Sequence, residues 1–449
     1  MNTLKLSKVC LIPVLVFFFA CKKDDIKLQD TPSVDPNKVQ YLPKTNEELL
    51  LVDNLKKTTE IFKELYKKKK NVEFVNSAIA SKTYTDESVL LYDLIFPQRS
   101  RLKDNKKFQN NLKILQIDLN SFANEFVAQV QKLNDPDYND FLQKIDRSSS
   151  SALRSSSFST GDQISVYFPY SDEFIDPNSG NGGITSYGTI TTLVTATADA
   201  DEGVGSLPVF VNGILQNYTQ ILVNDDYAEA NPTHIIGVNG IEPYDAGIGS
   251  IGTTLFPPEP PIDIPNLTRE VKQVYVGMVK CTKQYDRLIS ISGNGGGSEV
   301  RFTRSDGFLK VADGQVQADS YIVGEGSISR KNIKDPVFVS YDVEWDGDWE
   351  PTNIEQNLAI YEEDNRNTVE ISGEISTTLK LGIFNFTIKP IAYKVTIKSD
   401  DPIIKQTNFK HDVFFALNRT NLEALMIDGW PVRDRNAKVS FTLMDRTFY

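Results

Sequence analysis

Three acidic side chains stand at alternate positions in the segment DGDWE, where they are Asp346, Asp348 and Glu350. On an extended backbone, residues two apart point to the same side. Carboxylate oxygens are ligands that Ca²⁺ prefers, so these three acids are candidate calcium ligands. The segment is not an EF-hand, because Pro351 replaces the required glycine and Asn357 stands where a bidentate glutamate is needed. A solvated, turn-forming acidic segment is the favoured interpretation.

Acidic residues are the most abundant candidates for catalysis or metal binding, and similar acidic clusters occur at 224–226 and 362–365. A glycoside hydrolase needs two carboxylates at a set separation across a cleft. Sequence does not measure that separation, so we name no catalytic residue. A carboxylate-based glycoside hydrolase is therefore kept as an alternative to a protein without enzymatic activity.

Other catalytic residue types are scarce. The two histidines, His234 and His411, lie in no paired metal spacing, although zinc hydrolases need two or three nitrogen or sulfur ligands. No GxSxG nucleophile elbow occurs. Cys281 stands on a strand-like alternation, where a lone thiol acts as a small hydrophobe. These residues favour structural roles, and the chain reads more readily as a binding protein than as an enzyme.

Short alternating segments dominate the chain after Thr160 and are rich in Val, Ile, Thr and aromatic residues. They are QISVYF, ITTLVTATA, VYVGMVK, RLISISG, EVRF, FVSYDVEW and YKVTIK. Turn residues separate them, which is typical of antiparallel β-structure. The predicted fold class is therefore α+β, an N-terminal helical region followed by mainly antiparallel β-sandwich domains.

The region before these strands has helical periodicity. Thr45 and Glu48 have the spacing of a capping box at a helix start. A leucine- and phenylalanine-rich stripe from Leu112 to Leu133 recurs every three or four residues and predicts one helix. Asp135–Pro136 should end it.

Composition predicts the domain organisation. The expected segments are a signal peptide (1–20), a lipidated flexible tether (21–43), a helical domain (44–147), a serine-rich linker (148–160), a β-rich domain (161–255), a proline-rich linker (256–265) and a C-terminal β-sandwich domain (266–449).

Charge argues against nucleic acid as a partner. The chain has a formal charge of −12. From Ser151 onward it holds 24 basic and 40 acidic residues, whereas nucleic-acid binding needs clustered basic charge that displaces counterions from phosphates.

The N-terminus predicts export and a lipid anchor. Lys5 and Lys8 precede an apolar run, Val9–Ala20, that is too short to span a bilayer and fits a signal peptide. Phe18 to Cys21 resembles a bacterial lipobox, which implies that the thiol of Cys21 carries a diacylglycerol. Acyl chains contribute about 0.8 kcal/mol per buried CH₂, so the membrane is an expected partner.

The residues after Cys21 carry a second resemblance. Lys23, Asp24 and Asp25 resemble the surface-export signal of Bacteroidota lipoproteins, which implies an outward-facing position on the outer membrane. Stretches such as VYFPYSDEF, NDDYAEANPTHIIG, RLISISGNGGGSE and IYEEDNRN resemble uncharacterised lipoproteins of that phylum, and this resemblance implies no activity.

The expected function is thus a surface binding or adhesion module. Its ligand would be a glycan, a protein or an envelope component, with Ca²⁺ as the one cofactor considered. A structural subunit of a surface complex is the third alternative.

Overall fold

The computed structural model describes most of the chain after residue 42. The described ranges are 43–84, 87–148, 164–175, 190–212, 214–238, 269–293, 295–312, 315–362, 368–381, 384–398, 404–417, 426–427, 429–433 and 438–448. All of them belong to the second of two units, Met1–Val34 and Asp35–Tyr449. Cys21, the export-signal residues and nearly all of both predicted linkers lie outside the described residues.

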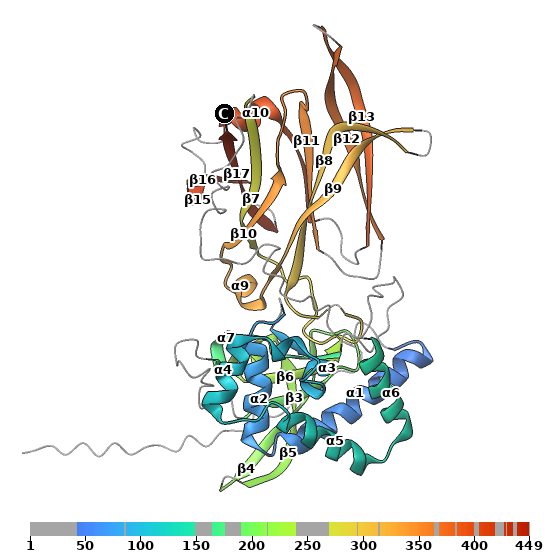
Figure 1. Ribbon diagram of the computed structural model, residues 1–449, viewed down its shortest axis with the longest axis vertical. Coiled ribbons are helices and arrows are strands. Elements are labelled where there is room, and N and C mark those ends of the chain that lie inside the picture. Colours follow the sequence, from blue (N-terminus) through green and yellow to red (C-terminus); the bar gives the residue numbers. More distant parts are fainter. Residues whose placement is uncertain are drawn as a thin grey trace, which may run out of the picture. The chain divides into compact units, whose positions relative to one another are not determined.

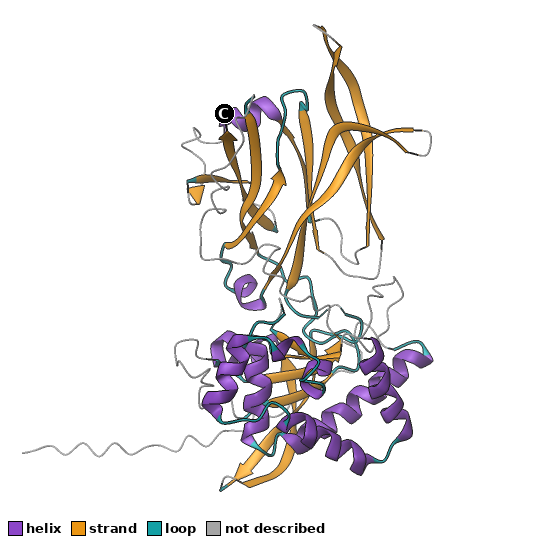
Figure 2. Cartoon of the chain, viewed as in Figure 1, coloured by secondary structure: helices purple, strands orange, loops and turns teal. Residues whose placement is uncertain are grey.

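Helices form the first part of the described chain (Figures 1 and 2). They are α1 (Asn46–Leu65), α2 (Lys69–Ala80), α3 (Leu91–Ile95), a 3₁₀ turn (Arg101–Lys103), α4 (Lys106–Leu115), α5 (Ser121–Leu133) and α6 (Pro136–Ser148). The predicted capping box is confirmed: Glu48 N donates to Thr45 Oγ1 at 3.1 Å, and Thr45 N donates to Glu48 Oε2 at 3.1 Å.

The single helix predicted over Leu112–Leu133 is wrong, because α4 and α5 divide that stretch. Gln116 takes a left-handed φ of 54° after α4, and Ile117 N then donates to Leu112 O at 2.9 Å. This is the closing pattern of a helix C-terminus. The predicted stop is confirmed, since α5 ends at Leu133 and α6 starts at Pro136.

A six-stranded sheet follows in the order β1-β2-β6-β3-β4-β5. Its strands are β1 (Ser88–Leu90), β2 (Ile164–Tyr167), β3 (Thr192–Thr195), β4 (Glu202–Val211), β5 (Ile214–Asn224) and β6 (Thr233–Val238). All neighbours pair antiparallel except β3 and β6, which are parallel. The short helices of this region are α7 (Ser171–Phe174) and α8 (Asp225–Ala230).

The helices and this sheet share one hydrophobic core. Phe62 of α1 and Phe122 of α5 are fully buried in it together with Val194 of β3 and Ile236 of β6. The helical and first β-rich regions therefore bury their apolar faces against each other, while the domain boundaries stay a prediction.

A segment after β7 also enters this core. Ile289 is buried and exchanges backbone hydrogen bonds of 2.9 and 3.0 Å with Ala200. Val238 N of β6 donates to Ser290 O at 2.9 Å. The segment RLISISG thus forms isolated bridges, not the strand that its alternation predicts.

The last part of the chain forms three antiparallel sheets. The five-stranded sheet contains, in order, β10 (Val339–Asp346), β7 (Val271–Cys281), β17 (Val439–Phe448), β16 (Trp430–Arg433) and β15 (Met426–Ile427). The four-stranded sheet contains β14 (Lys405–Lys410), β11 (Glu355–Glu362), β8 (Ser298–Ala312) and β9 (Gln315–Ile328). The third pairs β12 (Thr368–Leu381) with β13 (Phe384–Lys398), and the helices are α9 (Arg330–Lys334) and α10 (His411–Leu417).

The five- and four-stranded sheets share a second core. Phe302 of β8 and Phe441 of β17 meet with ring centroids 6.1 Å apart. Trp345 and Trp349 are buried in the same cluster with centroids 5.5 Å apart, so these rings are core residues. The mixed α+β class with N-terminal helices and antiparallel sheets is confirmed. Within the described residues, no helix is both long and apolar enough to cross a membrane.

Candidate functional site

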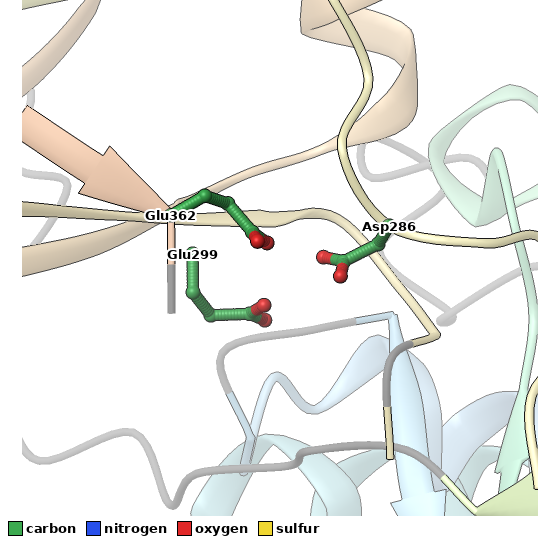
Figure 3. Close-up of side chains that lie close together, drawn as sticks. All are labelled: Asp286, Glu299 and Glu362. Atoms are coloured by element: carbon green, nitrogen blue, oxygen red, sulfur yellow. The ribbon is translucent and has the colours of Figure 1, made fainter. Parts of the chain in front are cut away.

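Three carboxylates from separate segments meet in the second half of the chain (Figure 3). Asp286 follows β7, Glu299 is the second residue of β8, and Glu362 is the last residue of β11. The antiparallel pairing of β8 with β11 places Glu362 opposite Val300, the neighbour of Glu299. Strand pairing therefore brings two of the acids together, and the segment after β7 adds the third.

These three side chains, here named the carboxylate cluster, offer oxygens that all lie within 4.8 Å of one another. Asp286 is 3% exposed and Glu362 is 0% exposed, whereas Glu299 is partly exposed. Among the residues described, this is the one group of three or more acidic, histidine or cysteine side chains with such proximity.

Arg330 of α9 is a buried cation beside the cluster. Its Nη2 donates to the backbone oxygen of Asp286 at 2.7 Å, and its Nη1 lies 3.0 Å from Asp225 Oδ1. Burial alone would lower the Arg330 pKa, but the nearby Tyr167, Asp225 and Asp286 raise it above its ordinary value. The guanidinium thus fixes the Asp286 backbone and contributes positive charge nearby.

The donor set of the cluster determines which metal it suits. Carboxylate oxygens bind Ca²⁺, Mg²⁺ and Mn²⁺, whereas structural zinc sites use mainly cysteine and histidine. Carboxylates this close repel one another and favour a shared cation or proton. The arrangement can therefore hold one hard divalent cation, with Ca²⁺ completing its shell of six to eight oxygens from water or backbone.

The acids predicted from DGDWE are placed differently. Asp346 is buried beside Arg304, at 3.1 Å, and accepts from Asp348 N at 2.8 Å. Asp348 and Glu350 both pair with Arg269, the latter at 3.3 Å. Burial raises the pKa of Asp346 despite Arg304. Arginines thus accompany all three acids, and a calcium site on this loop stays a prediction.

The histidines and the free cysteine lie in packed surroundings. His234 is fully buried with Nδ1 2.6 Å from the Tyr66 hydroxyl, and burial lowers its pKa to about 3. His411 packs against Trp349 with ring centroids 5.6 Å apart. Cys281 is buried, and burial raises its pKa to about 12. These surroundings agree with the structural roles expected from the sequence.

Sequence reasoning missed most of the carboxylate cluster. Glu362 belongs to one of the acidic clusters noted above, but Asp286 and Glu299 carry no local signal. Each is a single acid beside a strand-like segment. Only the pairing of β8 with β11, which is a long-range contact, brings Glu299 toward Glu362.

Comparison with known proteins adds no relative. No family model matches the chain, and neither does any curated protein or solved structure. The chemistry of the carboxylate cluster is therefore argued from its geometry alone.

Proposed function

We propose that this chain is a lipid-anchored, outward-facing outer-membrane protein that binds a surface partner and holds Ca²⁺ at the carboxylate cluster. The anchor rests on the lipobox-like sequence ending at Cys21 and on the acidic export signal that follows it. The partner would be a glycan, a protein or another envelope component.

The observation that carries the calcium proposal is the burial of the carboxylate cluster. Exposed acids gather commonly without a ligand, but Asp286 and Glu362 are almost completely removed from water. Burying a charged group costs several kcal/mol unless an opposite charge compensates for it. Arg330 contributes positive charge beside Asp286, and a divalent cation would add two further charges at the point where the three side chains meet.

Calcium at this position would join segments that are distant in sequence. It would link the segment after β7 to β8 and β11, whose strands contribute to the second core. We extend the proposal to the sheets themselves: the five- and four-stranded sheets, which share that core, form a β-sandwich with the cation bracing one part of it. A rigid β-framework of this kind supports binding loops.

The glycoside-hydrolase alternative is less favoured at this site. Retaining glycosidases hold their two carboxyl groups about 5 to 5.5 Å apart, and the spacing within the cluster is similar. However, a sugar ring must reach both groups, and Asp286 and Glu362 are buried. The cluster therefore fits a small cation better than a polysaccharide.

Thermal unfolding with and without Ca²⁺ tests the metal proposal. The chain from Lys22 onward retains the whole unit Asp35–Tyr449. Ca²⁺ at 100 times its dissociation constant should stabilise the fold by about 2.7 kcal/mol, and EDTA should reverse the shift. Glu362→Gln should abolish the response, whereas the matched variant Glu350→Gln should keep it. A response lost only in Glu350→Gln would instead favour the DGDWE loop.

Whole-cell fractionation tests the anchor independently. Cys21→Ser should move the protein out of the membrane fraction. Replacing Lys23, Asp24 and Asp25 by alanine should leave lipidation intact but protect the protein from protease added to whole cells. Unchanged protease sensitivity would contradict the outward-facing position.

The partner class needs a separate measurement. A panel of polysaccharides added to the Ca²⁺-loaded chain should shift its melting temperature if the partner is a glycan. Reducing sugar released from the same panel would instead support the hydrolase alternative. Stoichiometric co-purification of envelope proteins without any glycan response would support a structural subunit.

A further inference from the structure

The hairpin of β4 and β5 extends past its own sheet. Ser206 of β4 still pairs with Leu193 of β3. Beyond it, residues 207–211 of β4 pair with β5. The segments 207–211 and 214–219 thus form a two-stranded extension, here named the β4–β5 arm (Figure 1). Such a hairpin is marginally stable in water without further contacts, so a binding partner would stabilise it.

Charge is missing from this hairpin. Residues 203–224 contain no Asp, Glu, Lys or Arg, although a quarter of the whole chain is charged (24%). The tip is apolar and open to water: the side chains of Phe210, Val211 and Ile214 are 36%, 52% and 66% exposed. Exposed apolar groups gathered in one place mark interaction sites.

The distribution of these side chains indicates the kind of partner. A strand added to the open edge of β5 would contact its whole length, but the exposed side chains along that edge include Gln216, Asn217 and Gln220, which are polar. The apolar side chains gather instead at the turn, where Val211 pairs with Ile214. A partner with an apolar interior, into which only the tip inserts, therefore fits better than an added strand.

The base of the arm is fixed to the helical region. The Tyr218 hydroxyl donates to the backbone oxygen of Lys63 on α1 at 2.8 Å, and the Lys63 ammonium lies 5.5 Å from the centre of the Tyr218 ring. Asp201 and Asp225 lie at the base of the hairpin, where they pair with Arg287 and Arg330. The tip itself carries no charged side chain, so it suits an apolar environment.

We infer that the tip of the β4–β5 arm inserts into the apolar layer of a lipid surface, as a second membrane contact of the anchored chain. This inference rests on the proposed lipid anchor. The 22 residues from Lys22 to Pro43 span at most roughly 75 Å, which keeps the folded part near the bilayer and raises the effective concentration of the tip. Stable membrane attachment commonly combines two such signals.

Vesicle co-sedimentation tests the arm without the anchor. The unacylated chain from Lys22 onward is mixed with phosphatidylcholine vesicles, and the bound fraction is measured in low and high salt. Binding should persist in high salt, because apolar insertion is not screened. The double variant Phe210→Ser/Ile214→Ser should bind the vesicles at least about tenfold more weakly than the wild type. The matched control Val337→Ser/Val413→Ser changes two exposed apolar residues elsewhere and should bind like the wild type.

A tip tryptophan gives a second readout that does not depend on affinity. Ile214→Trp should show a blue-shifted emission on vesicles and quenching by brominated acyl chains. Absence of vesicle binding, or equal binding by the arm variant and the control, would overturn the inference. So would a dimer in solution that the arm variant dissociates while vesicles bind neither form. Failure here leaves the Cys21 fractionation result unaffected, so the two proposals fail separately.

Discussion

Asp286 and Glu362 approach with carboxylate oxygens within 4.8 Å of each other, and both side chains are buried. One lies on the segment after β7 and the other ends β11. Two like charges this close destabilise a fold unless a cation or proton compensates. In the function proposed above that cation is Ca²⁺, so we expect stability to depend on the ion.

Glu362→Gln should change the free energy of unfolding in opposite directions with and without Ca²⁺. Without the ion, the variant removes one of three adjacent negative charges and should be more stable than the wild type, by about 1–3 kcal/mol. With saturating Ca²⁺ it lacks a ligand and should be the less stable protein. Urea unfolding of the variant and the wild type, in EDTA and in Ca²⁺, measures the difference in their unfolding free energy under each condition. A variant that is less stable in both conditions would indicate that Glu362 has another role.

Asp93 should make stability fall as pH rises. Burial raises its pKa to about 6 from an ordinary 3.8, although Tyr84 donates a hydrogen bond to it. Between these two values the folded chain retains a proton that the unfolded chain has lost, so increasing pH favours unfolding. Asp93→Asn keeps a hydrogen-bond acceptor for Tyr84 and should remove this dependence, with a gain of up to about 3 kcal/mol above pH 6.

Urea unfolding at pH 4, 5, 6 and 7 measures the Asp93 effect. The exposed Asp104→Asn is the matched control and should keep the pH profile of the wild type. If Asp93→Asn and the wild type differ by the same free energy at every pH, the shifted titration of Asp93 is wrong.

Gly237 should be intolerant of a side chain because β6 packs closely on the segment that carries Asp286. A Cβ at this position would lie 2.6 Å from the backbone oxygen of Ser290 and 3.0 Å from Ala196 Cβ. Gly237→Ala should therefore destabilise the fold by about 1–3 kcal/mol, and by displacing this segment it should weaken Ca²⁺ binding.

Gly203→Ala is the comparison for that variant. Its Cβ would meet the end of the Ile289 side chain at 2.5 Å, which can rotate away, whereas backbone cannot. The loss of stability measured by urea unfolding should be smaller than for Gly237→Ala. The reverse order would contradict the close packing of the Ser290 segment on β6.

Thr45→Ala should destabilise α1 by about 1 kcal/mol, because it removes the hydroxyl that accepts from Glu48 N. Thr45→Ser retains an acceptor and should lose much less. Thermal unfolding of the two variants compares them directly, and equal losses would show that the capping box contributes little.

Local features of the fold were predictable from sequence, and features that depend on distant contacts were not. The start of α1 follows from residues three apart, Thr45 and Glu48, which contact each other within one turn. The break at Gln116 was missed, because the apolar stripe from Leu112 continues past a residue that takes a left-handed conformation. Ile117 is buried immediately after that break. The apolar spacing therefore reflects which residues are buried, and it does not require one continuous helix.

The carboxylate cluster shows the same distinction. The alternation in DGDWE is visible in sequence. In the structure, however, Asp346 pairs with Arg304, whereas Asp348 and Glu350 pair with Arg269. Asp286 and Glu299 join Glu362 only through strand pairing and through the packing of the Ser290 segment on β6. A single sequence gives no signal for either contact.

Isothermal titration of the chain from Lys22 onward with Ca²⁺ tests the proposed calcium site most directly. We expect one ion per chain at the carboxylate cluster, loss of that binding in Glu362→Gln, and retention of it in Asp348→Asn/Glu350→Gln. No binding by the wild type, or binding that survives Glu362→Gln, would contradict it.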